Sequence, residues 1–294
     1  MSKLGAFFES LRLDSLRFNS LKKSKVPPPF GPPVNDWGVY IGNNRALTKT
    51  VFGHKMIVDT RDLSLTPHLL AEGRWEYWIT KVFQSEVKPG MKVVDIGANL
   101  GYYSVLAAQA IGPKGHLTCF EANPQLADIV FHNLHLNGFV ERCTVENKAV
   151  FSETRELELQ VFQNYLGSSS LWADTAHAQN FHDKLEPVKV EGVRLDDYFP
   201  AGTAVDFMKI DAEGAEPHIL QGAGRLLNDS PSVSILMEFA PPMLRASFGS
   251  IEGFYQSLKS KGFDIYEIRP DSSLVALPLA RAEEISWTDV VLKR

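Results

Sequence analysis

The strongest chemical signal in the sequence is a glycine-containing segment at residues 93–104, VVDIGANLGYYS. An apolar run leads into Gly97 and Gly101, and a helical pattern follows them. Glycine lets the backbone turn tightly and approach a ligand closely, and the first turn of a helix has free N–H groups. The segment therefore predicts a strand-to-helix loop that holds a nucleotide-like molecule. The alternative is an ordinary turn without a ligand.

Two carboxylates indicate which molecule this loop holds. Glu121 ends the next apolar run, where a carboxylate can accept hydrogen bonds from both hydroxyls of a ribose. Asp95 lies at the end of the first run and suits the positively charged amino group of a methionine moiety. A dinucleotide site would show the spacing G-x-G-x-x-G, whereas three residues separate Gly97 from Gly101. This spacing disfavours a nicotinamide-dependent oxidoreductase.

The residues KIDAEGAE at 209–216 place three carboxylates within six positions. Such a cluster is costly in an apolar cleft unless its members are paired, protonated or bound to a metal. We expect Asp211 to orient an acceptor hydroxyl or take its proton, with Glu213 as an alternative base and Lys209 as a balancing charge. The other interpretation is that Glu213 and Glu216 only favour the start of the following helix through its dipole.

Glu238 ends a further apolar run and is the third candidate catalytic residue, after Asp211 and Glu213. These three carboxylates could hold a divalent cation such as Mg²⁺, which prefers oxygen ligands. An acceptor-binding or structural role for Glu238 is the alternative. His218 is expected to accept a proton or to lie at the surface. Residues 167–170, GSSS, form either a lid and acceptor wall or an ordinary loop.

These residues need a scaffold that brings strand ends together. After the turn at Pro89-Gly90, apolar runs alternate with helical periodicity almost to the end of the chain. The expected strands are 93–96, 117–121, 144–147, 157–162, 188–193, 205–210, 233–239, 263–268 and 288–292. The expected helices are 102–111, 124 to the Asn137-Gly138 stop, 215–227 and, as the last, 251–261. This alternation predicts a doubly wound, Rossmann-like α/β fold whose ligands bind beyond the carboxyl ends of a mostly parallel sheet.

The composition narrows the class of protein. The net charge is −5 although residues 1–25 carry six Lys or Arg residues against Glu9 and Asp14, so the rest of the chain is acidic. Nucleic acid is bound largely by phosphate neutralisation, and an acidic body disfavours it as a partner. No stretch approaches the roughly 20 apolar residues of a membrane span, and no secretory signal is present. With only Cys119 and Cys143, the expected location is the cytoplasm.

The sequence resembles the FkbM family of class I methyltransferases. The matching motifs are VVDIGANLGYYS at 93–104, FEANP at 120–124, NKAV at 147–150, VRLDDYF at 193–199 and MKIDAEGAEPHILQGA at 208–223. The resemblance covers roughly Asp95 to Phe239 and is specific because the two longest motifs occur in the right order at the right interval. It implies a seven-stranded sheet with a final antiparallel strand, S-adenosylmethionine as methyl donor, and O-methylation of sugars or natural products.

The resemblance also implies a set of cofactor contacts. The methionine portion would lie among Asp95, Gly97, Ala98, Asn99 and Gly101, and the ribose would lie against Glu121. Asn123 would lie beside the ribose or adenine, and Asn147, Lys148 and Ala149 beside the adenine edge. The product would be S-adenosylhomocysteine.

Three regions are expected along the chain. Residues 1–35 combine a basic amphipathic segment with a proline-rich linker, and 89–294 form the methyltransferase domain. The amphipathic segment 1–25 would associate with a membrane surface or dock on its own domain or a second subunit. Residues 36–88 begin with a β-like pattern and contain a helical region at 63–83. This extension would cap the acceptor site or form a dimer element, and its aromatic residues would line an acceptor pocket or a core.

We therefore expect an S-adenosylmethionine-dependent O-methyltransferase whose acceptor is a hydroxyl of a sugar, a glycan or a small natural product. The alternatives are a methyltransferase that acts on RNA or protein, and a catalytically silent scaffold that binds an adenosyl ligand. The acidic body argues against RNA, and the intact acidic motif at 209–216 argues against a silent scaffold. Acceptor pockets are built from variable loops, so the sequence leaves the acceptor itself open.

Overall fold

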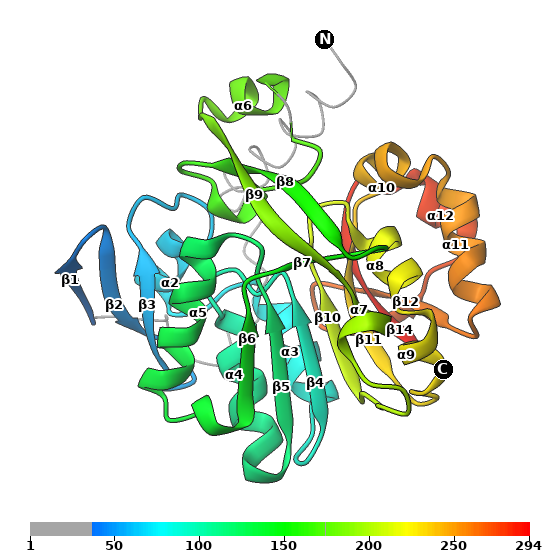
Figure 1. Cartoon of the computed structure of the whole chain (residues 1–294), viewed down its shortest axis with the longest axis horizontal. Coiled ribbons are helices and arrows are strands. Elements are labelled where there is room, and N and C mark those ends of the chain that lie inside the picture. The colour runs from blue at the N-terminus through cyan, green and yellow to red at the C-terminus, as the bar shows by residue number, and fades with distance from the viewer. Residues whose placement is uncertain (1–36, 174) are drawn as a thin grey trace.

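The computed structural model describes residues 37–173 and 175–294, so the amphipathic segment and linker expected at 1–35 lie outside the described residues. Its centre is an eight-stranded sheet with the order β13-β12-β14-β11-β10-β4-β5-β6 (Figure 1). The strands are β4 (Lys92–Ile96), β5 (His116–Phe120), β6 (Cys143–Glu146), β10 (Phe207–Ile210), β11 (Ser234–Phe239), β12 (Asp264–Ile268), β13 (Leu274–Ala276) and β14 (Thr288–Lys293). The expected Rossmann-like sheet is therefore confirmed.

The direction of the last strand matches the arrangement that the family resemblance implies. Strands β6, β5, β4, β10 and β11 run parallel to one another, and β14 is antiparallel to both β11 and β12. The sheet has eight strands rather than the expected seven because the short β13 adds to the edge beyond β12. This added strand lies at the far edge of the sheet from β6, so the central strand order is unchanged.

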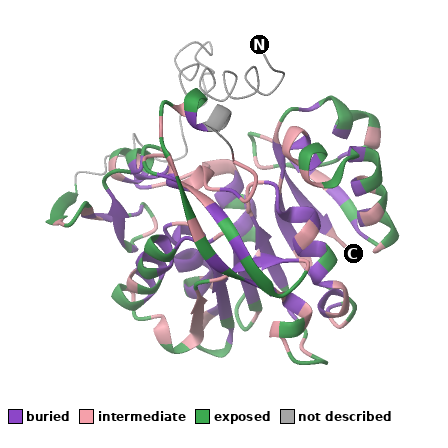
Figure 2. Ribbon diagram, turned by 45° about the horizontal axis from the view of Figure 1, so that its top comes forward, coloured by how far each residue is buried: buried purple, intermediate pink, exposed green. Residues whose placement is uncertain are grey.

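Helices cover both faces of the sheet, and the strands alternate between two cores. In β4, Val93 packs into one core and Val94 into the other. The first core holds α3 (Tyr77–Glu86), α4 (Tyr102–Ile111) and α5 (Pro124–Leu136), and the second holds α7 (Leu195–Tyr198), α8 (Glu216–Gly222), α9 (Gly224–Asn228), α10 (Pro241–Phe248), α11 (Ile251–Ser260) and α12 (Leu279–Glu284). Figure 2 shows the sheet buried and the outer helix faces exposed.

Two smaller sheets flank the central one. Strands β1 (Gly38–Gly42), β2 (Arg45–Lys49) and β3 (Lys55–Asp59) form an antiparallel sheet, and β3 packs on α5. Between β6 and β10 along the chain lie β7 (Ala149–Phe151), β8 (Arg155–Phe162) and β9 (Leu185–Arg194), with 3-10 helix η3 (Leu166–Ser168) and α6 (Thr175–Phe181) between β8 and β9. Strands β8 and β9 cross the upper part of the molecule in Figure 1. The N-terminal extension and this insertion are therefore separate additions to the central sheet.

The structure corrects three sequence expectations. The helical region expected at 63–83 is two helices, α2 (Thr66–Glu72) and α3, because Gly73 adopts a left-handed φ of 64° that ends α2. The helix expected at 215–227 is divided at Ala223 into α8 and α9. The helix at 251–260 is followed by α12, so it is not the last one.

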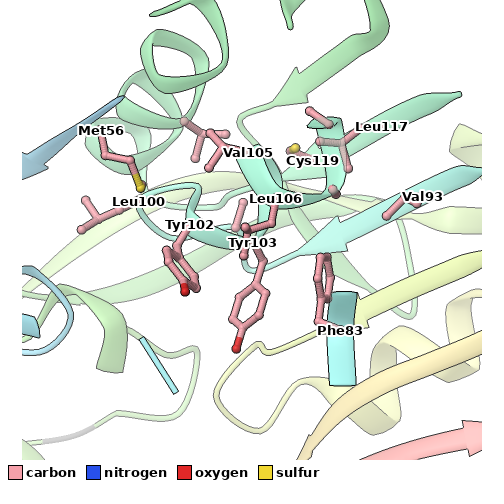
Figure 3. Packing of buried hydrophobic residues seen from close by; sticks show 14 of the residues in the cluster. Met56, Phe83, Val93, Leu100, Tyr102, Tyr103, Val105, Leu106, Leu117 and Cys119 are labelled. Carbon is pink, nitrogen blue, oxygen red and sulfur yellow. The ribbon is translucent and has the colours of Figure 1, made fainter. Parts of the chain in front are cut away.

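The first core packs aromatic rings against the central strands. The Phe83 ring lies 4.9 Å from the Tyr103 ring and 5.4 Å from the Phe207 ring, centroid to centroid. Figure 3 shows Phe83, Tyr102 and Tyr103 in this core, with both tyrosine hydroxyls at the same side of the cluster. Tyr102 and Tyr103 are buried, so their hydroxyls need partners inside the protein. No helix in the ranges 37–173 and 175–294 is both long and apolar enough to span a membrane.

Asn133 of α5 joins the N-terminal sheet to the glycine loop, and its loss is expected to destabilise the protein. Its side chain is fully buried, accepts from Ile57 N at 2.6 Å and donates to Ile57 O at 2.9 Å and Leu100 O at 2.8 Å. Asn133→Ala leaves three backbone groups without partners, at a cost of about 3 kcal/mol. Denaturant unfolding measures the loss.

Asn137, one turn further along the helix, provides the matched control. It makes the same pair of bonds to Lys55 N and Lys55 O, but water can reach these groups. Asn137→Ala is therefore expected to cost less than about 1 kcal/mol. Equal losses of unfolding free energy in the two variants would show that the burial of the Asn133 hydrogen bonds does not add to stability.

Candidate active site

The loop between β4 and α4 lies between the ends of two neighbouring strands. Gly97 N donates to Phe120 O at 2.9 Å, and Asp211 N donates to Ile96 O at 3.1 Å. Gly97 has a φ of +74°, and a Cβ atom at this position would lie 1.8 Å from the backbone oxygen of Asp211. The close contact between this loop and the end of β10 therefore depends on glycine.

Glu121, directly after β5, is held by backbone donors. Its two carboxylate oxygens accept from Asn99 N at 2.7 Å and from Asn123 N at 2.8 Å. The side chain is buried, and burial raises the pKa of Glu121 to about 7 despite these two donors. The carboxylate is thus fixed beside the glycine loop, where its remaining lone pairs can accept hydrogen bonds from the hydroxyls of a ligand.

A pocket open to solvent lies at this edge of the sheet, and the empty space within it, open solvent included, is about 680 Å³. Seven of the predicted site residues line it: Gly97, Asn99, Glu121, Lys148, Ala149, Asp211 and Glu213. Six predicted cofactor or catalytic residues do not: Asp95, Ala98, Gly101, Asn123, Asn147 and Glu238. The pocket thus joins the predicted cofactor loop to two of the three predicted catalytic carboxylates.

The predicted cofactor residues outside the pocket lining have structural contacts. Asp95 Oδ2 accepts from Ser104 Oγ at 2.6 Å, while its buried Oδ1 has no hydrogen-bond partner within the described chain. Asn123 Oδ1 caps α5 by accepting from Gln125 N at 3.0 Å. Gly101 is the N-cap of α4 with a φ of 81°, and Ala98 N donates to Phe120 O at 3.2 Å.

Lys209 is the buried cation of the site. Its Nζ lies 3.0 Å from Asp211 Oδ2 and 5.0 Å from the centroid of the Tyr103 ring. Burial disfavours the ammonium, but the negative charges of Asp211 and Asp95 outweigh it and raise the pKa of Lys209. Lys209 therefore stays charged and fixes one oxygen of Asp211 toward the core, while the Asp211 side chain remains 42% exposed.

In the turn after β10, Glu213 and Glu216 have different surroundings, which the sequence left open. Glu216 is buried and its Oε1 accepts from Ala212 N at 3.0 Å and Gly214 N at 3.3 Å, so it closes the turn. Glu213 lines the pocket with a left-handed φ of 49°, which is strained for a non-glycine residue. Burial, followed by the charge of Asp211, raises the pKa of Glu213 well above its usual value.

Glu238 lies beside the pocket rather than in its wall. Its Oε1 accepts from Trp287 Nε1 at 2.7 Å, and its Oε2 is buried with no hydrogen-bond partner among the residues described. Burial raises the pKa of Glu238 well above its usual value, and the charges of Glu213 and Asp211 add to this. Across the described ranges, no three His, Cys, Asp or Glu side chains converge as a metal site, so this trio does not fit the expected cation.

The insertion supplies another wall of the pocket. Gly167, Ser169 and Ser170 line it, and Ser170 Oγ donates to Glu213 O at 2.9 Å. A Cβ atom on Gly167 would lie 2.9 Å from Asn99 Nδ2, so this wall closes directly on the glycine loop. His218 is half-buried and stacks on Phe151 with ring centroids 4.6 Å apart, outside the pocket lining.

Sequence reasoning missed two carboxyls near this edge. Glu76 lies between α2 and α3, inside the helical region expected at 63–83, and Gly73 is the signal that could have revealed the break. Asp289 of β14 pairs in register with Glu238, so both side chains lie on one face of the sheet. Asp289 is almost fully buried, and its Oδ2 is without a partner in the part of the chain described.

The buried carboxyls of Glu121 and Glu216 predict that the free energy of unfolding increases as the pH falls from about 8 to about 6.5. Burial raises the pKa of Glu121 and of Glu216 to about 7 from the usual 4.5. A carboxyl whose pKa is raised by folding stabilises the protein at low pH and loses this contribution as the pH rises through the folded-state value. We expect about 1 kcal/mol per carboxyl over one pH unit, measured by urea unfolding without ligand.

The prediction is confined to this pH window because two histidines act in the opposite direction. Burial lowers the pKa of His54 and of His218 below 6.5, so their protonation in the unfolded state destabilises the native protein at lower pH. A free energy of unfolding that stays constant or rises from pH 6.5 to 8 would contradict the raised carboxyl pKa values.

Several known proteins are similar to this chain. Methyltransferase sdnD of Sordaria araneosa is 26% identical over 203 residues, which cover 61% of this chain and 76% of that protein. Protein-L-isoaspartate O-methyltransferase of Hyperthermus butylicus is 35% identical over 68 residues, and this chain spans only 28% of its length. The crystal structure of the O-methyltransferase from Bacillus cereus in complex with SAH shares 15% identity, with a TM-score of 0.41 over 80% of this chain and 83% of that one.

A family model described as the methyltransferase FkbM domain matches residues 95–265. The match includes the glycine loop, Glu121 and the acidic turn after β10. Because it covers more than half of the sequence, the chain belongs to the FkbM family of S-adenosylmethionine-dependent methyltransferases.

Proposed function

We propose that the protein transfers the methyl group of S-adenosylmethionine to a hydroxyl of a sugar, a glycan or a small natural product. The observation that carries this proposal is the position of Asp211. Its carboxylate lines the pocket beside Gly97 and is held by buried Lys209 at 3.0 Å. A fixed carboxylate next to a donor site is suited to orient a neutral hydroxyl and to accept its proton.

The residues of the pocket fit the donor. Glu121 presents a carboxylate held by two backbone N–H groups, which suits the two hydroxyls of a ribose. Asn99 Oδ1 and Asp95 Oδ1 are buried acceptors with no partner within residues 37–173 and 175–294, and they suit the ammonium of a methionine group. Lys148 and Ala149 line the same pocket and would lie beside the adenine. The roles of these side chains are part of the proposal.

In the proposed mechanism, the side chains of the protein position the acceptor hydroxyl and take its proton. When bound, S-adenosylmethionine supplies an electrophilic methyl group on a positively charged sulfur. The pocket holds the acceptor hydroxyl close to this methyl in line for attack, and this positioning is the main contribution of the enzyme. Asp211 takes the hydroxyl proton as the new bond forms, and Glu213 is the alternative base. Because Asp211, Glu213 and Glu238 do not form a cation site among the residues described, we assign no step to a metal.

Product analysis tests the proposed acceptor class. The purified protein is incubated with methyl-labelled S-adenosylmethionine and separate panels of polyols and sugars, primary amines, peptides and RNA. We expect label only in the hydroxyl panel, with an O-methyl group identified by NMR. Transfer to nitrogen, to peptide or to RNA would contradict the proposal while leaving the methyltransferase family assignment intact.

A further inference from the structure

Glu76 combines an unusual backbone with a side chain directed at the core of the site. It is the N-cap residue of α3, with a φ of 39°, yet its side chain makes no capping hydrogen bond. A left-handed conformation is strained for glutamate, and strained residues gather where function requires a particular geometry. Glu76 Oε2 instead accepts from Tyr103 OH at 3.4 Å. The conformation therefore serves the direction of the carboxylate and not the start of the helix.

Tyr103 connects Glu76 to the acidic turn. The Lys209 ammonium lies 5.0 Å from the centre of the Tyr103 ring and 3.0 Å from Asp211 Oδ2. Asp95 and Lys209 pair in register on β4 and β10, so their side chains lie on the same face of the sheet, the face covered by α3 and α4. Glu76 thus approaches the pocket edge of the sheet, where we propose that methyl transfer takes place, from the helices that cover this face.

The same face carries more negative than positive groups. Glu238 and Asp289 pair in register on β11 and β14; β11 lies next to β10, and β14 lies on the other side of β11. Asp289 is 9% exposed, and its Oδ2 is buried without a hydrogen-bond partner in the described ranges. Several carboxyls clustered around the ammonium of Lys209 are stable only if they are protonated or if a ligand brings positive charge.

We propose that Glu76 is a positioning residue whose negative charge, acting beside Lys209 and Asp211, makes the site bind the cationic methyl donor in preference to the neutral product. This inference rests on the proposed donor, S-adenosylmethionine. The donor and S-adenosylhomocysteine share the adenosine, the ammonium and the carboxylate, and they differ in the methyl group and its positive sulfur. Their affinity ratio therefore reports the charge of the site. A consequence is that Glu76 favours release of the product after transfer.

The ionisation of Glu76 falls within an accessible pH range. Burial, with the charge of Asp211 added and that of Lys209 opposed, raises the pKa of Glu76 to about 7. The titratable and charged groups that interact with it are Tyr102 and Tyr103 of α4, Lys209, Asp211 and Glu213 at the end of β10, and Asp289 of β14. Arg74, ahead of α3, acts on Tyr102. The preference for the donor should therefore weaken as the pH falls from about 8 to about 6.

The test measures both affinities by isothermal titration with the full chain at about pH 8 and about pH 6. In the wild type, the affinity ratio of S-adenosylmethionine to S-adenosylhomocysteine should fall at the lower pH. Glu76→Gln should lower the ratio about 5-fold at pH 8, as expected for the loss of one nearby charge in a partly screened site, and should flatten its pH dependence. Glu76→Asp should restore part of the ratio.

Glu72→Gln is the matched control, because it makes the same chemical change on α2 at a half-exposed glutamate paired with Arg74. It should leave the ratio unchanged. If Glu76→Gln folds poorly, Glu76→Gly replaces it, since glycine accepts the left-handed backbone and also removes the charge.

The possible results distinguish this inference from the proposed function. If both ligands bind and the ratio is the same in the wild type and the charge-removing variants, Glu76 has no such role and the donor site stands. If neither ligand binds to the wild-type protein, the proposed function fails and this inference fails with it.

Discussion

Gly97→Ala is expected to weaken S-adenosylmethionine binding by about 100-fold, which corresponds to roughly 3 kcal/mol. The φ of +74° is unfavourable for alanine, and its Cβ atom would lie 1.8 Å from the backbone oxygen of Asp211. Relief of this contact requires the glycine loop to separate from the end of β10. That movement changes the wall of the pocket formed by Gly97, Asn99 and Asp211. Isothermal titration of the folded variant measures the effect.

Gly90→Ala separates backbone strain from this contact. Gly90 has a similar φ of +84°, but a Cβ atom there meets nothing within 4 Å. We expect Gly90→Ala to lower stability by about 1 kcal/mol and to retain the donor affinity of the wild type. Wild-type affinity in a folded Gly97→Ala protein would show that the loop geometry does not govern donor binding.

Asp211→Asn is expected to reduce turnover by about 100-fold or more and to leave donor affinity within a few-fold of the wild type. Asparagine keeps the size of the side chain but cannot accept the acceptor's proton. It also removes the charge that pairs with the buried ammonium of Lys209 at 3.0 Å. Release of S-adenosylhomocysteine, measured with a hydroxyl compound found in the acceptor panel, gives the turnover.

Two further variants complete this test. Asp197→Asn removes a carboxylate from α7 that lies 3.8 Å from Arg194 and outside the pocket lining, so it should leave turnover unchanged. Glu213→Gln tests the alternative base. If Asp211→Asn and Glu213→Gln both retained full turnover and donor affinity, the assignment of these carboxylates would be wrong.

The sequence predicts much of this edge of the sheet because of one geometric rule. Glu121 follows β5 and Asp211 follows β10, and carboxyl ends of parallel strands meet at the same edge. Short apolar runs that end in a glycine or a carboxylate therefore identify residues that lie close in space. The rule does not say which atoms face the pocket: Asp95 Oδ2 accepts from Ser104 Oγ and Asn123 Oδ1 caps α5, and neither residue lines the pocket.

The residues that sequence reasoning missed do not follow that rule. Glu76 comes from a break between two helices, and the apolar periodicity on both sides of it predicts a helical region without indicating where that region is broken. Asp289 lies near the beginning of β14, which is antiparallel, so its early residues lie beside the end of β11. A strand's direction and the site of a helix break depend on long-range packing, which a single sequence does not display.

Isothermal titration of the purified protein with S-adenosylmethionine, S-adenosylhomocysteine and NAD tests the central claim most directly. The spacing of Gly97 and Gly101, the anchored carboxylate of Glu121 and the pocket between them predict that the first two ligands bind and that NAD does not. Binding of NAD alone, or of none of the three, would contradict the assignment of this pocket as a methyl-donor site.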